Sequence, residues 1–326
     1  MQEIKYSVIG TSWITNSFIE GAKLVDGLQL DGVYSRSEEK GNAFAQAVGA
    51  KRVFKSIEEV ADSDTDFVYV ASPNSCHYEQ CKFLLENKKH VICEKPVTVT
   101  SEEFSKLFFL AEENNVRYFE AIMYMHTSAR YALKEAIQSI GNITSAHFDY
   151  SQLSSKYDML LSGGLPNIFN PEMKTGALND LGIYCVYPAI DLFGEPQEVT
   201  ALQHFLFTGA DGAGSAILKY KDKIITVSYS KVAEGRAPSQ ILGDEGAVTI
   251  DAVSQLKGIK NFDKKGNIID EIASEDKITL MSNEARSMYN FITDFEHNKG
   301  LYYECATMSQ KVLNCMEKMR TDNGTE

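Results

Sequence analysis

The first part of the chain alternates short apolar runs with segments whose apolar residues recur at helical spacing. The apolar runs predict strands at Lys5–Ile9, Leu28–Tyr34, Phe67–Ala71, His90–Cys93 and Arg117–Glu120. The segments between them predict helices at Phe18–Leu24, Ser37–Val48, Ser75–Glu86 and Ser101–Asn114. Alternating strands and helices are typical of an α/β fold, in which crossover helices cover a doubly wound parallel sheet.

A different pattern begins after residue 121, where a predicted helix at Ser128–Ser139 is followed by strands joined through turn residues. These strands are predicted at Ile143–Gln152, Val199–Phe207, Ser215–Tyr220, Lys223–Tyr229 and Ala247–Asp251. Successive strands of this kind indicate a mostly antiparallel sheet. The segment Met281–Met319 returns to helical spacing, with a break near Asn298–Gly300, and we leave open whether these helices pack back onto the first domain. A chain of 326 residues is longer than a single hydrophobic core usually serves, so we predict two domains, at 1–121 and 122–326.

The composition excludes several classes of protein. With 44% apolar and 24% charged residues, the chain is an ordinary globular protein, and its net charge of −13 argues against a nucleic-acid partner. The six cysteines do not cluster with histidines at metal-ligand spacing, so we predict no metal site. No apolar run approaches membrane length and no signal-peptide pattern precedes the first strand, so we expect a cytoplasmic protein without a membrane partner.

The tripeptide Glu94-Lys95-Pro96 follows the fourth predicted strand, at the edge where open α/β sheets bind ligands. Proline cannot continue the strand, so the chain must turn there. Burial and neighbouring charges readily shift the pKa of a lysine, which makes Lys95 a candidate proton donor to a reacting oxygen. The alternative is a solvated lysine before a turn proline.

The segment Gly10-Thr11-Ser12-Trp13-Ile14-Thr15 joins the first strand to the first helix, where dinucleotide-binding folds place their phosphate loop. It keeps only the first glycine of Gly-x-Gly-x-x-Gly, because Ser12 and Thr15 replace the other two. Its position between a strand and a helix nevertheless predicts a phosphate loop. The residues that we expect to contact the cofactor here are Gly10, Thr11, Ser12, Trp13 and Ile14.

The second predicted strand ends at Ser35 and Arg36, about where dinucleotide-binding folds contact the adenosine ribose. An acidic residue there would select the free 2′-hydroxyl of NAD, whereas a guanidinium can hold the 2′-phosphate of NADP. The only nearby strand acid, Asp31, lies inside the strand, so the tip favours NADP, with NAD as the alternative. The competing interpretation is that Ser37 caps the next helix and Arg36 is solvated.

The third predicted strand ends in small and polar residues that face the same edge of the sheet. We expect Ser72, Pro73, Asn74 and His77 to contact the cofactor, although His77 has an equally good interpretation as a buried structural histidine.

A further pair of candidate residues lies in the second domain. If Asp180 begins a helix that runs to Phe193, Tyr184 lies four residues on and shares its face. A carboxylate and a phenol would then point together into the interdomain cleft. The alternative is that Asp180 caps the helix and Tyr184 packs in the core.

Taken in order, these motifs resemble the Gfo/Idh/MocA family, the family of glucose-fructose oxidoreductase and inositol dehydrogenase. The motifs that carry the resemblance are Gly10–Ile14, Ser35-Arg36, Pro73–His77, Glu94–Pro96, Glu120-Ala121 and Gly176–Tyr184. The resemblance implies an N-terminal Rossmann domain and a second α/β domain whose open sheet forms a homodimer or larger homo-oligomer. It also implies that Glu94 and Lys95 lie at the cofactor, and that Lys95, Asp180 and Tyr184 are the catalytic residues.

Two details refine the resemblance. The tyrosine at Tyr184 and the Ser35-Arg36 tip look like the glucose-fructose oxidoreductase and dihydrodiol dehydrogenase branches. Met123–Thr127, by contrast, lacks the arginine and proline that relatives carry after Glu120-Ala121, so the substrate is not carried over.

We therefore expect an NADP-preferring oxidoreductase that moves a hydride between nicotinamide and a carbohydrate-like small molecule, such as a sugar, polyol or dihydrodiol. Lys95 or Tyr184 would protonate the developing alkoxide while the other polarises it, and Asp180 would orient the pair. The alternative is a dinucleotide-binding sensor without turnover. The joint presence of all three residues counts against a sensor, which needs none of them for proton transfer.

Overall fold

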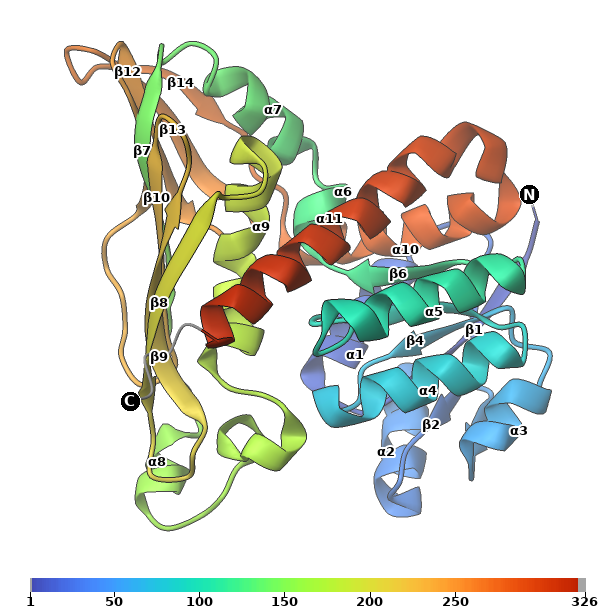
Figure 1. Cartoon of the computed structure of the whole chain (residues 1–326). Coiled ribbons are helices and arrows are strands. Elements are labelled where there is room, and N and C mark those ends of the chain that lie inside the picture. Colours follow the sequence, from blue (N-terminus) through green and yellow to red (C-terminus); the bar gives the residue numbers. More distant parts are fainter. Residues whose placement is uncertain (1, 322–326) are drawn as a thin grey trace. The chain divides into compact units, whose positions relative to one another are not determined.

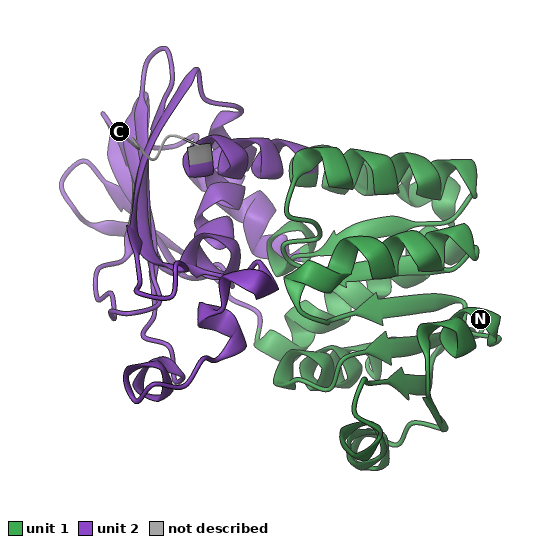
Figure 2. Ribbon diagram, turned by 60° about the horizontal axis from the view of Figure 1, so that its bottom comes forward, with its two compact units in different colours: residues 1–126, 276–309 green, residues 127–275, 310–326 purple. Residues whose placement is uncertain are grey.

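A computed structural model describes residues 2–321, and their contacts divide the chain into two compact units (Figures 1 and 2). Unit 1 extends through His126 and also includes Asp276–Ser309, whereas unit 2 begins at Thr127, runs to Glu275 and resumes at Gln310. The assignment of a cofactor domain to 1–121 and a substrate domain to 122–326 stays a prediction.

Unit 1 contains a six-stranded parallel sheet in the order β3-β2-β1-β4-β5-β6. Its strands are β1 (Ile4–Ile9), β2 (Leu28–Tyr34), β3 (Arg52–Phe54), β4 (Phe67–Val70), β5 (His90–Glu94) and β6 (Tyr118–Ala121). The strand order reverses between β1 and β4, which is the point where ligands bind in such sheets. The predicted parallel sheet is confirmed, but β3 was missed because three residues show no periodicity.

Helices cover both faces of this sheet, as a parallel sheet requires. They are α1 (Trp13–Ala22), α2 (Glu38–Val48), α3 (Ile57–Asp62), α4 (Asn74–Glu86), α5 (Ser101–Glu113), α6 (Met123–His126) and α10 (Lys277–Thr293). Buried side chains of α1, α2 and α10 share one core, whereas α4 and α5 lie side by side elsewhere on the sheet (Figure 1). The first helix begins at Trp13 and not at the predicted Phe18, because polar residues in its first turn conceal the helical pattern.

The core of unit 1 depends on close approach of its elements. Phe18 of α1 stacks on Tyr69 of β4, with ring centroids 3.9 Å apart. A Cβ added to Gly21 of α1 would lie only 2.6 Å from the Cβ of Met281, so the glycine lets α10 pack directly on α1. This packing brings residues from near the end of the sequence to the helix that follows β1.

Unit 2 contains an eight-stranded sheet in the order β14-β13-β12-β11-β7-β10-β9-β8. The strands are β7 (Ile143–Ser151), β8 (Glu198–Phe205), β9 (Asp211–Lys219), β10 (Ile224–Ser230), β11 (Ser239–Gly243), β12 (Gly246–Ala252), β13 (Lys257–Asp263) and β14 (Ile268–Ile272). All neighbouring strands are antiparallel except β7 and β10, so the predicted mostly antiparallel sheet is confirmed. The sequence patterns missed β11, β13 and β14.

The helical segments of unit 2 include α7 (Ser128–Ala136), α8 (Tyr157–Leu161), α9 (Ile183–Phe193) and a π-helical turn, Leu178–Gly182, directly before α9. Short 3-10 turns occupy Asn167–Phe169 and Pro171–Met173. The final helix, α11 (Phe295–Thr321), follows a break at Asp294 and not at the predicted Asn298–Gly300, because Gly300 is accommodated inside the helix. None of the helices among residues 2–321 is long and apolar enough to cross a membrane.

Candidate functional site

The loop between β1 and α1 has the shape of a phosphate loop because of Gly10. Its φ of +106° lies in the region that favours glycine, and an added Cβ would lie 2.4 Å from the carbonyl oxygen of Ala71. Ser12 precedes the helix, but its side chain does not cap it and instead lies 3.3 Å from the Thr15 hydroxyl. The first-turn amides of α1 therefore have no side-chain cap from Ser12, and a glycine-shaped loop before a helix N-terminus fits a dinucleotide pyrophosphate.

Trp13 extends from this loop, with 67% of its surface exposed. The ammonium of Lys277, at the start of α10, lies 3.6 Å from the centroid of the indole ring, which is a cation–π contact. Lys277 was not predicted from the sequence, because only the packing of α10 on α1 brings it to the loop.

At the tip of β2, the Ser37 side chain accepts a hydrogen bond from the Lys40 amide at 3.3 Å and so caps α2. The Ser37 part of the competing interpretation is therefore correct. Arg36 is exposed and forms no ion pair with any residue that the structure describes. Its guanidinium is thus available to a ligand, and the role of Ser35 and Arg36 at the cofactor stays a prediction.

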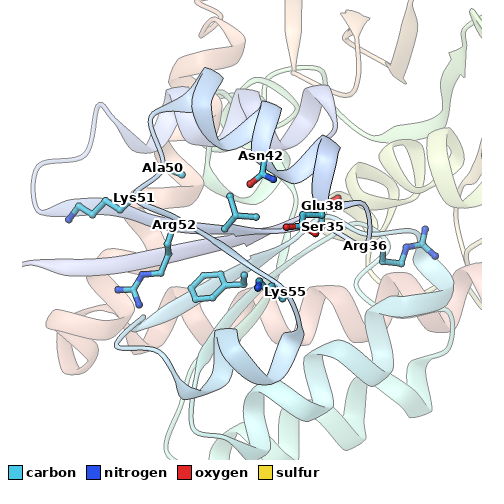
Figure 3. A pocket seen from close by; sticks show the side chains of 10 residues that line it. Ser35, Arg36, Glu38, Asn42, Ala50, Lys51, Arg52 and Lys55 are labelled. Carbon is cyan, nitrogen blue, oxygen red and sulfur yellow. The ribbon is translucent and has the colours of Figure 1, made fainter.

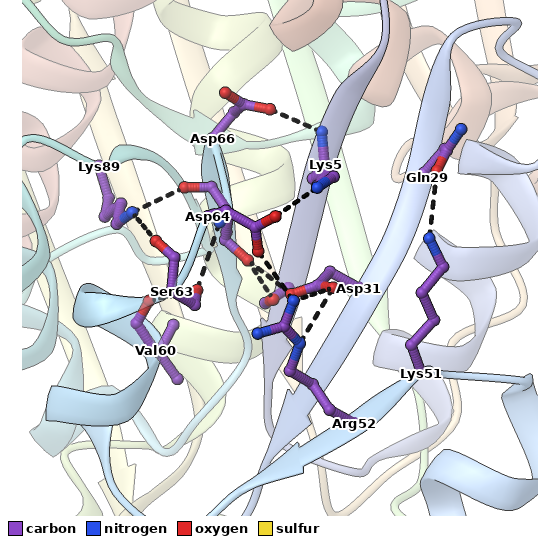
Figure 4. Close-up of polar contacts among 12 residues, drawn as sticks. Lys5, Gln29, Asp31, Lys51, Arg52, Val60, Ser63, Asp64, Asp66 and Lys89 are labelled. Atoms are coloured by element: carbon purple, nitrogen blue, oxygen red, sulfur yellow. Dashed lines mark hydrogen bonds and ion pairs between the residues drawn. The ribbon is translucent and has the colours of Figure 1, made fainter.

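Asp31 is committed elsewhere, as the polar network of Figure 4 shows. It lies inside β2, almost fully buried, and accepts hydrogen bonds from Arg52 Nε at 3.1 Å and from an Arg52 terminal nitrogen at 2.9 Å. Thr65 donates to its other oxygen at 3.3 Å. A carboxylate held in this way inside a strand does not reach a ribose at the strand's end, which removes the acid that would select NAD.

His77 joins two loops at the carboxyl edge of the sheet. Its Nδ1 lies 2.9 Å from the Pro96 carbonyl oxygen and its Nε2 lies 2.9 Å from the Ser72 carbonyl oxygen. Burial lowers the pKa of this imidazole. Both ring nitrogens lie against backbone carbonyl oxygens, and the neutral ring donates its single N–H to one of them. This packing favours the structural interpretation over direct contact with the cofactor.

The neighbouring residues of this loop are also held in place. The Ser72 hydroxyl donates to Gln80 Oε1 at 2.6 Å, Pro73 precedes α4, and Asn74 is its first residue. Their predicted contacts with the cofactor stay predictions.

The Glu94-Lys95-Pro96 turn follows β5, and the bond between Lys95 and Pro96 is cis. The Tyr69 hydroxyl donates to the Glu94 carboxylate, and burial raises the pKa of Glu94. Glu120 also holds the turn in place, because its carboxylate accepts a hydrogen bond from the Val97 amide at 2.8 Å. Lys95 therefore leaves a well-anchored turn at the same edge of the sheet as the phosphate loop.

A second buried acid, Glu284 of α10, lies close enough to Glu94 and Tyr69 to interact with both electrostatically. Its side chain is 1% exposed, and its Oε2 has no hydrogen-bond partner among residues 2–321. Burial, together with the negative charge of Glu94, raises the pKa of Glu284 well above its usual range, so the neutral acid is favoured. The helical spacing of apolar residues in α10 did not predict that Glu284 lies near Glu94 and Tyr69.

In unit 2, Asp180 lies in the π-helical turn before α9, which corrects the prediction that it begins an α-helix. Asp180 also does not cap α9, whose N-cap residue is Gly182, and its carboxylate forms an ion pair with the Lys231 ammonium. Tyr184, in the first turn of α9, packs edge-on against Tyr150, with ring centroids 5.6 Å apart. Lys231 was not predicted, since its position just after β10 carries no sequence signal.

The turn that carries Asp180 is shaped by Gly176 and Asp211. Gly176 has a φ of +114°, and an added Cβ would lie 1.8 Å from Asp211 Oδ1. Asp211 Oδ2 accepts a hydrogen bond from the Leu178 amide at 2.7 Å, and burial raises the pKa of Asp211 to about 6. Arg320 donates to Asn179 at 2.5 Å, so the turn is held from both sides.

Sequence comparison assigns the chain to a family. Residues 4–122 match the model of the oxidoreductase family with an NAD-binding Rossmann fold, and residues 131–249 match the GFO/IDH/MocA C-terminal domain. The chain belongs to the Gfo/Idh/MocA family, as its motifs predicted. Membership confirms the predicted class of enzyme, an NAD(P)-dependent oxidoreductase.

Individual relatives agree with this assignment. The chain is 36% identical to scyllo-inositol 2-dehydrogenase (NADP(+)) IolU of Bacillus subtilis, over 91% of this chain and 89% of the relative. It is 29% identical to trans-1,2-dihydrobenzene-1,2-diol dehydrogenase of Xenopus laevis, over 76% of this chain and 74% of that protein. Among solved structures, KijD10, a 3-ketoreductase from Actinomadura kijaniata in complex with NADP and TDP-benzene, matches with a TM-score of 0.86 over 99% of this chain and 98% of the other, at 18% identity. That likeness concerns the fold alone.

Proposed function

We propose that this protein is an NADP-dependent oxidoreductase that interconverts an alcohol and a carbonyl group in a carbohydrate-like small molecule. The observation that carries the proposal is the edge of the unit 1 sheet, where Lys95 follows β5 and the loop shaped by Gly10 follows β1. The relatives that act on scyllo-inositol and on a dihydrodiol support a polyol, sugar or dihydrodiol as substrate.

The chain's own residues supply binding and proton transfer. Bound nicotinamide supplies the hydride chemistry. Ser35 and Arg36 would hold the 2′-phosphate, since Asp31 is held inside β2 by Arg52. Lys95 or Tyr184 would hold the proton that the substrate oxygen gains or loses.

Asp180 has a more specific part than the sequence suggested. Its carboxylate is paired with Lys231, so it presents a fixed and partly neutralised charge one turn before Tyr184. We propose that this ion pair positions the turn and tunes the tyrosine, while the proton itself moves through Tyr184 or Lys95.

The test is a screen of polyols, sugars and dihydrodiols with NADP(+) and NAD(+), followed by nicotinamide absorbance. With a substrate in hand, Lys95→Met and Tyr184→Phe should each lower turnover by about 10² or more, while cofactor affinity changes much less. Matched controls are Lys82→Met, on the exposed surface of α4, and Tyr131→Phe, exposed on α7.

Wild-type turnover in both site variants would refute the assigned mechanism. If no substrate is found, but a small molecule from the screen alters cofactor affinity, the sensor alternative replaces the enzyme.

We also propose a homodimer or larger homo-oligomer built on the open face of the unit 2 sheet. Strand pairing places Leu202, Ile217 and Ile224 on one face, opposite the face that buries Ala216 and Val227. Leu202 is 72% exposed and Ile224 52%, and a sheet face with such residues favours association. Light scattering at micromolar concentration should give at least a dimer mass, and a monomer would contradict the proposal.

A cytoplasmic location is the last part of the proposal. None of the six cysteines forms a disulfide, as is usual where thiols are kept reduced. Recovery in the soluble cytoplasmic fraction of cells would support it, and export from the cell would contradict it.

A further inference from the structure

We propose that Lys55 is a second cation that selects the 2′-phosphate of NADP, acting beside Arg36. The inference rests on the proposed function and adds a residue to its cofactor site. β2 and β3 run parallel, with Tyr34 opposite Phe54. The residues that follow, Ser35 and Lys55, therefore leave neighbouring strands at the same edge of the sheet, where strands lie about 4.8 Å apart.

A cavity of about 520 Å³ opens here, between α2, the end of β2 and the whole length of β3. Ser35, Arg36, Asn42 and Lys55 are among the residues that line it (Figure 3). A volume of this order is within the range of small-ligand sites. The cavity thus lies between the end of β2, where we expect the adenosine ribose to bind, and β3, a strand that the sequence pattern did not predict.

The cations around the cavity differ in what they contact. Arg52 is committed to Asp31 and Asp64, at 2.9 and 2.8 Å, and the Lys51 ammonium donates to Gln29 at 3.2 Å. Arg36 and Lys55 form no ion pair with any of the described residues. A phosphate dianion in the cavity would find these two charges uncommitted.

Two acids lie near these cations. Glu38 lines the cavity but is exposed in the first turn of α2, where the helix dipole favours negative charge. Glu59 accepts a hydrogen bond from the Lys55 backbone amide at 2.8 Å, which fixes the chain at Lys55 and leaves its ammonium to reach the cavity. The 2′-hydroxyl of NAD carries no charge, so Lys55 would distinguish the two cofactors.

The experiment measures NADPH and NADH binding to the whole chain by calorimetry. Lys55→Met should weaken NADPH binding about five- to tenfold, the range expected for an exposed charge on a phosphate, and change NADH binding less than twofold. The matched control is Lys82→Met, the same substitution on the exposed surface of α4, at a lysine that does not line the cavity. It should change both affinities less than twofold, and Lys55→Arg should retain the NADPH preference.

A second ligand pair removes the nicotinamide from the comparison. Adenosine 2′,5′-bisphosphate and adenosine 5′-monophosphate differ only in the 2′-phosphate, so Lys55→Met should weaken binding of the bisphosphate alone. Equal loss for both members of either pair, or a Lys55→Met variant that matches Lys82→Met, would overturn the inference and leave the proposed function intact. If the wild-type chain binds neither dinucleotide, the proposed function itself fails.

Discussion

Asp211 provides a direct test of how the turn that carries Asp180 is held. It is the first residue of β9, and its carboxylate accepts the Leu178 amide of the π-helical turn at 2.7 Å. Replacing it with asparagine keeps the shape and an oxygen acceptor but removes the charge. The comparison between Asp211→Asn and wild type therefore isolates the ionisation of one side chain.

The direction in which stability changes with pH follows from the direction of the pKa shift of Asp211. Burial raises the pKa of Asp211 from 3.8 to about 6, so the folded chain holds this proton more tightly than the unfolded chain. The stability that Asp211 contributes is present below pH 3.8 and is lost as the pH rises through about 6. A shift of this size corresponds to about 3 kcal/mol, and partial access of solvent to the side chain reduces the expected value to about 1–3 kcal/mol.

The assay is urea unfolding of both proteins between pH 4 and pH 8, followed by circular dichroism. Relative to wild type, Asp211→Asn should gain about 1–3 kcal/mol in free energy of unfolding as the pH rises across this interval. Asp270→Asn makes the same substitution at an exposed aspartate of β14 in the same sheet and controls for the substitution itself. A constant difference for Asp211→Asn, or a variant that loses stability as the pH rises, would refute the reasoning.

Two further predictions concern unit 1. Gly10→Ala should lower stability by about 1–3 kcal/mol and abolish dinucleotide binding, because it adds strain at positive φ and a clash with Ala71. Gly49→Ala is also at positive φ, but apart from its chain neighbours no described residue comes within 4 Å of its added Cβ; it should cost less in a thermal melt, and equal costs would contradict the clash. Glu284→Gln should become progressively more stable than wild type as the pH rises, because the raised pKa of Glu284 means that its stabilising contribution is lost on ionisation. Chemical denaturation at pH 5 and pH 9 checks the direction. A free energy of unfolding that rises more between these pH values in wild type than in the variant would contradict it.

The sequence alone determined the fold class, the family and the ends of the strands that carry Gly10, Arg36 and Lys95. Each of these depends on local patterns: apolar runs, helical spacing, and glycine or proline at a strand's end. Such patterns act over a few residues, so they can be read without knowing which strands pair. They also sufficed for the mostly antiparallel sheet of unit 2, although they missed three of its strands, β11, β13 and β14.

Only the tertiary structure decided what the individual polar side chains contact. Asp31 is held by Arg52, Asp180 pairs with Lys231, and Glu284 lies near Glu94, although the partners in each pair are far apart in the sequence. Lys55 entered the candidate site only because β3, a strand of three residues, pairs with β2. The free energy of a buried or paired charge depends on which groups the fold places within a few ångströms, and no local pattern of residues carries that information.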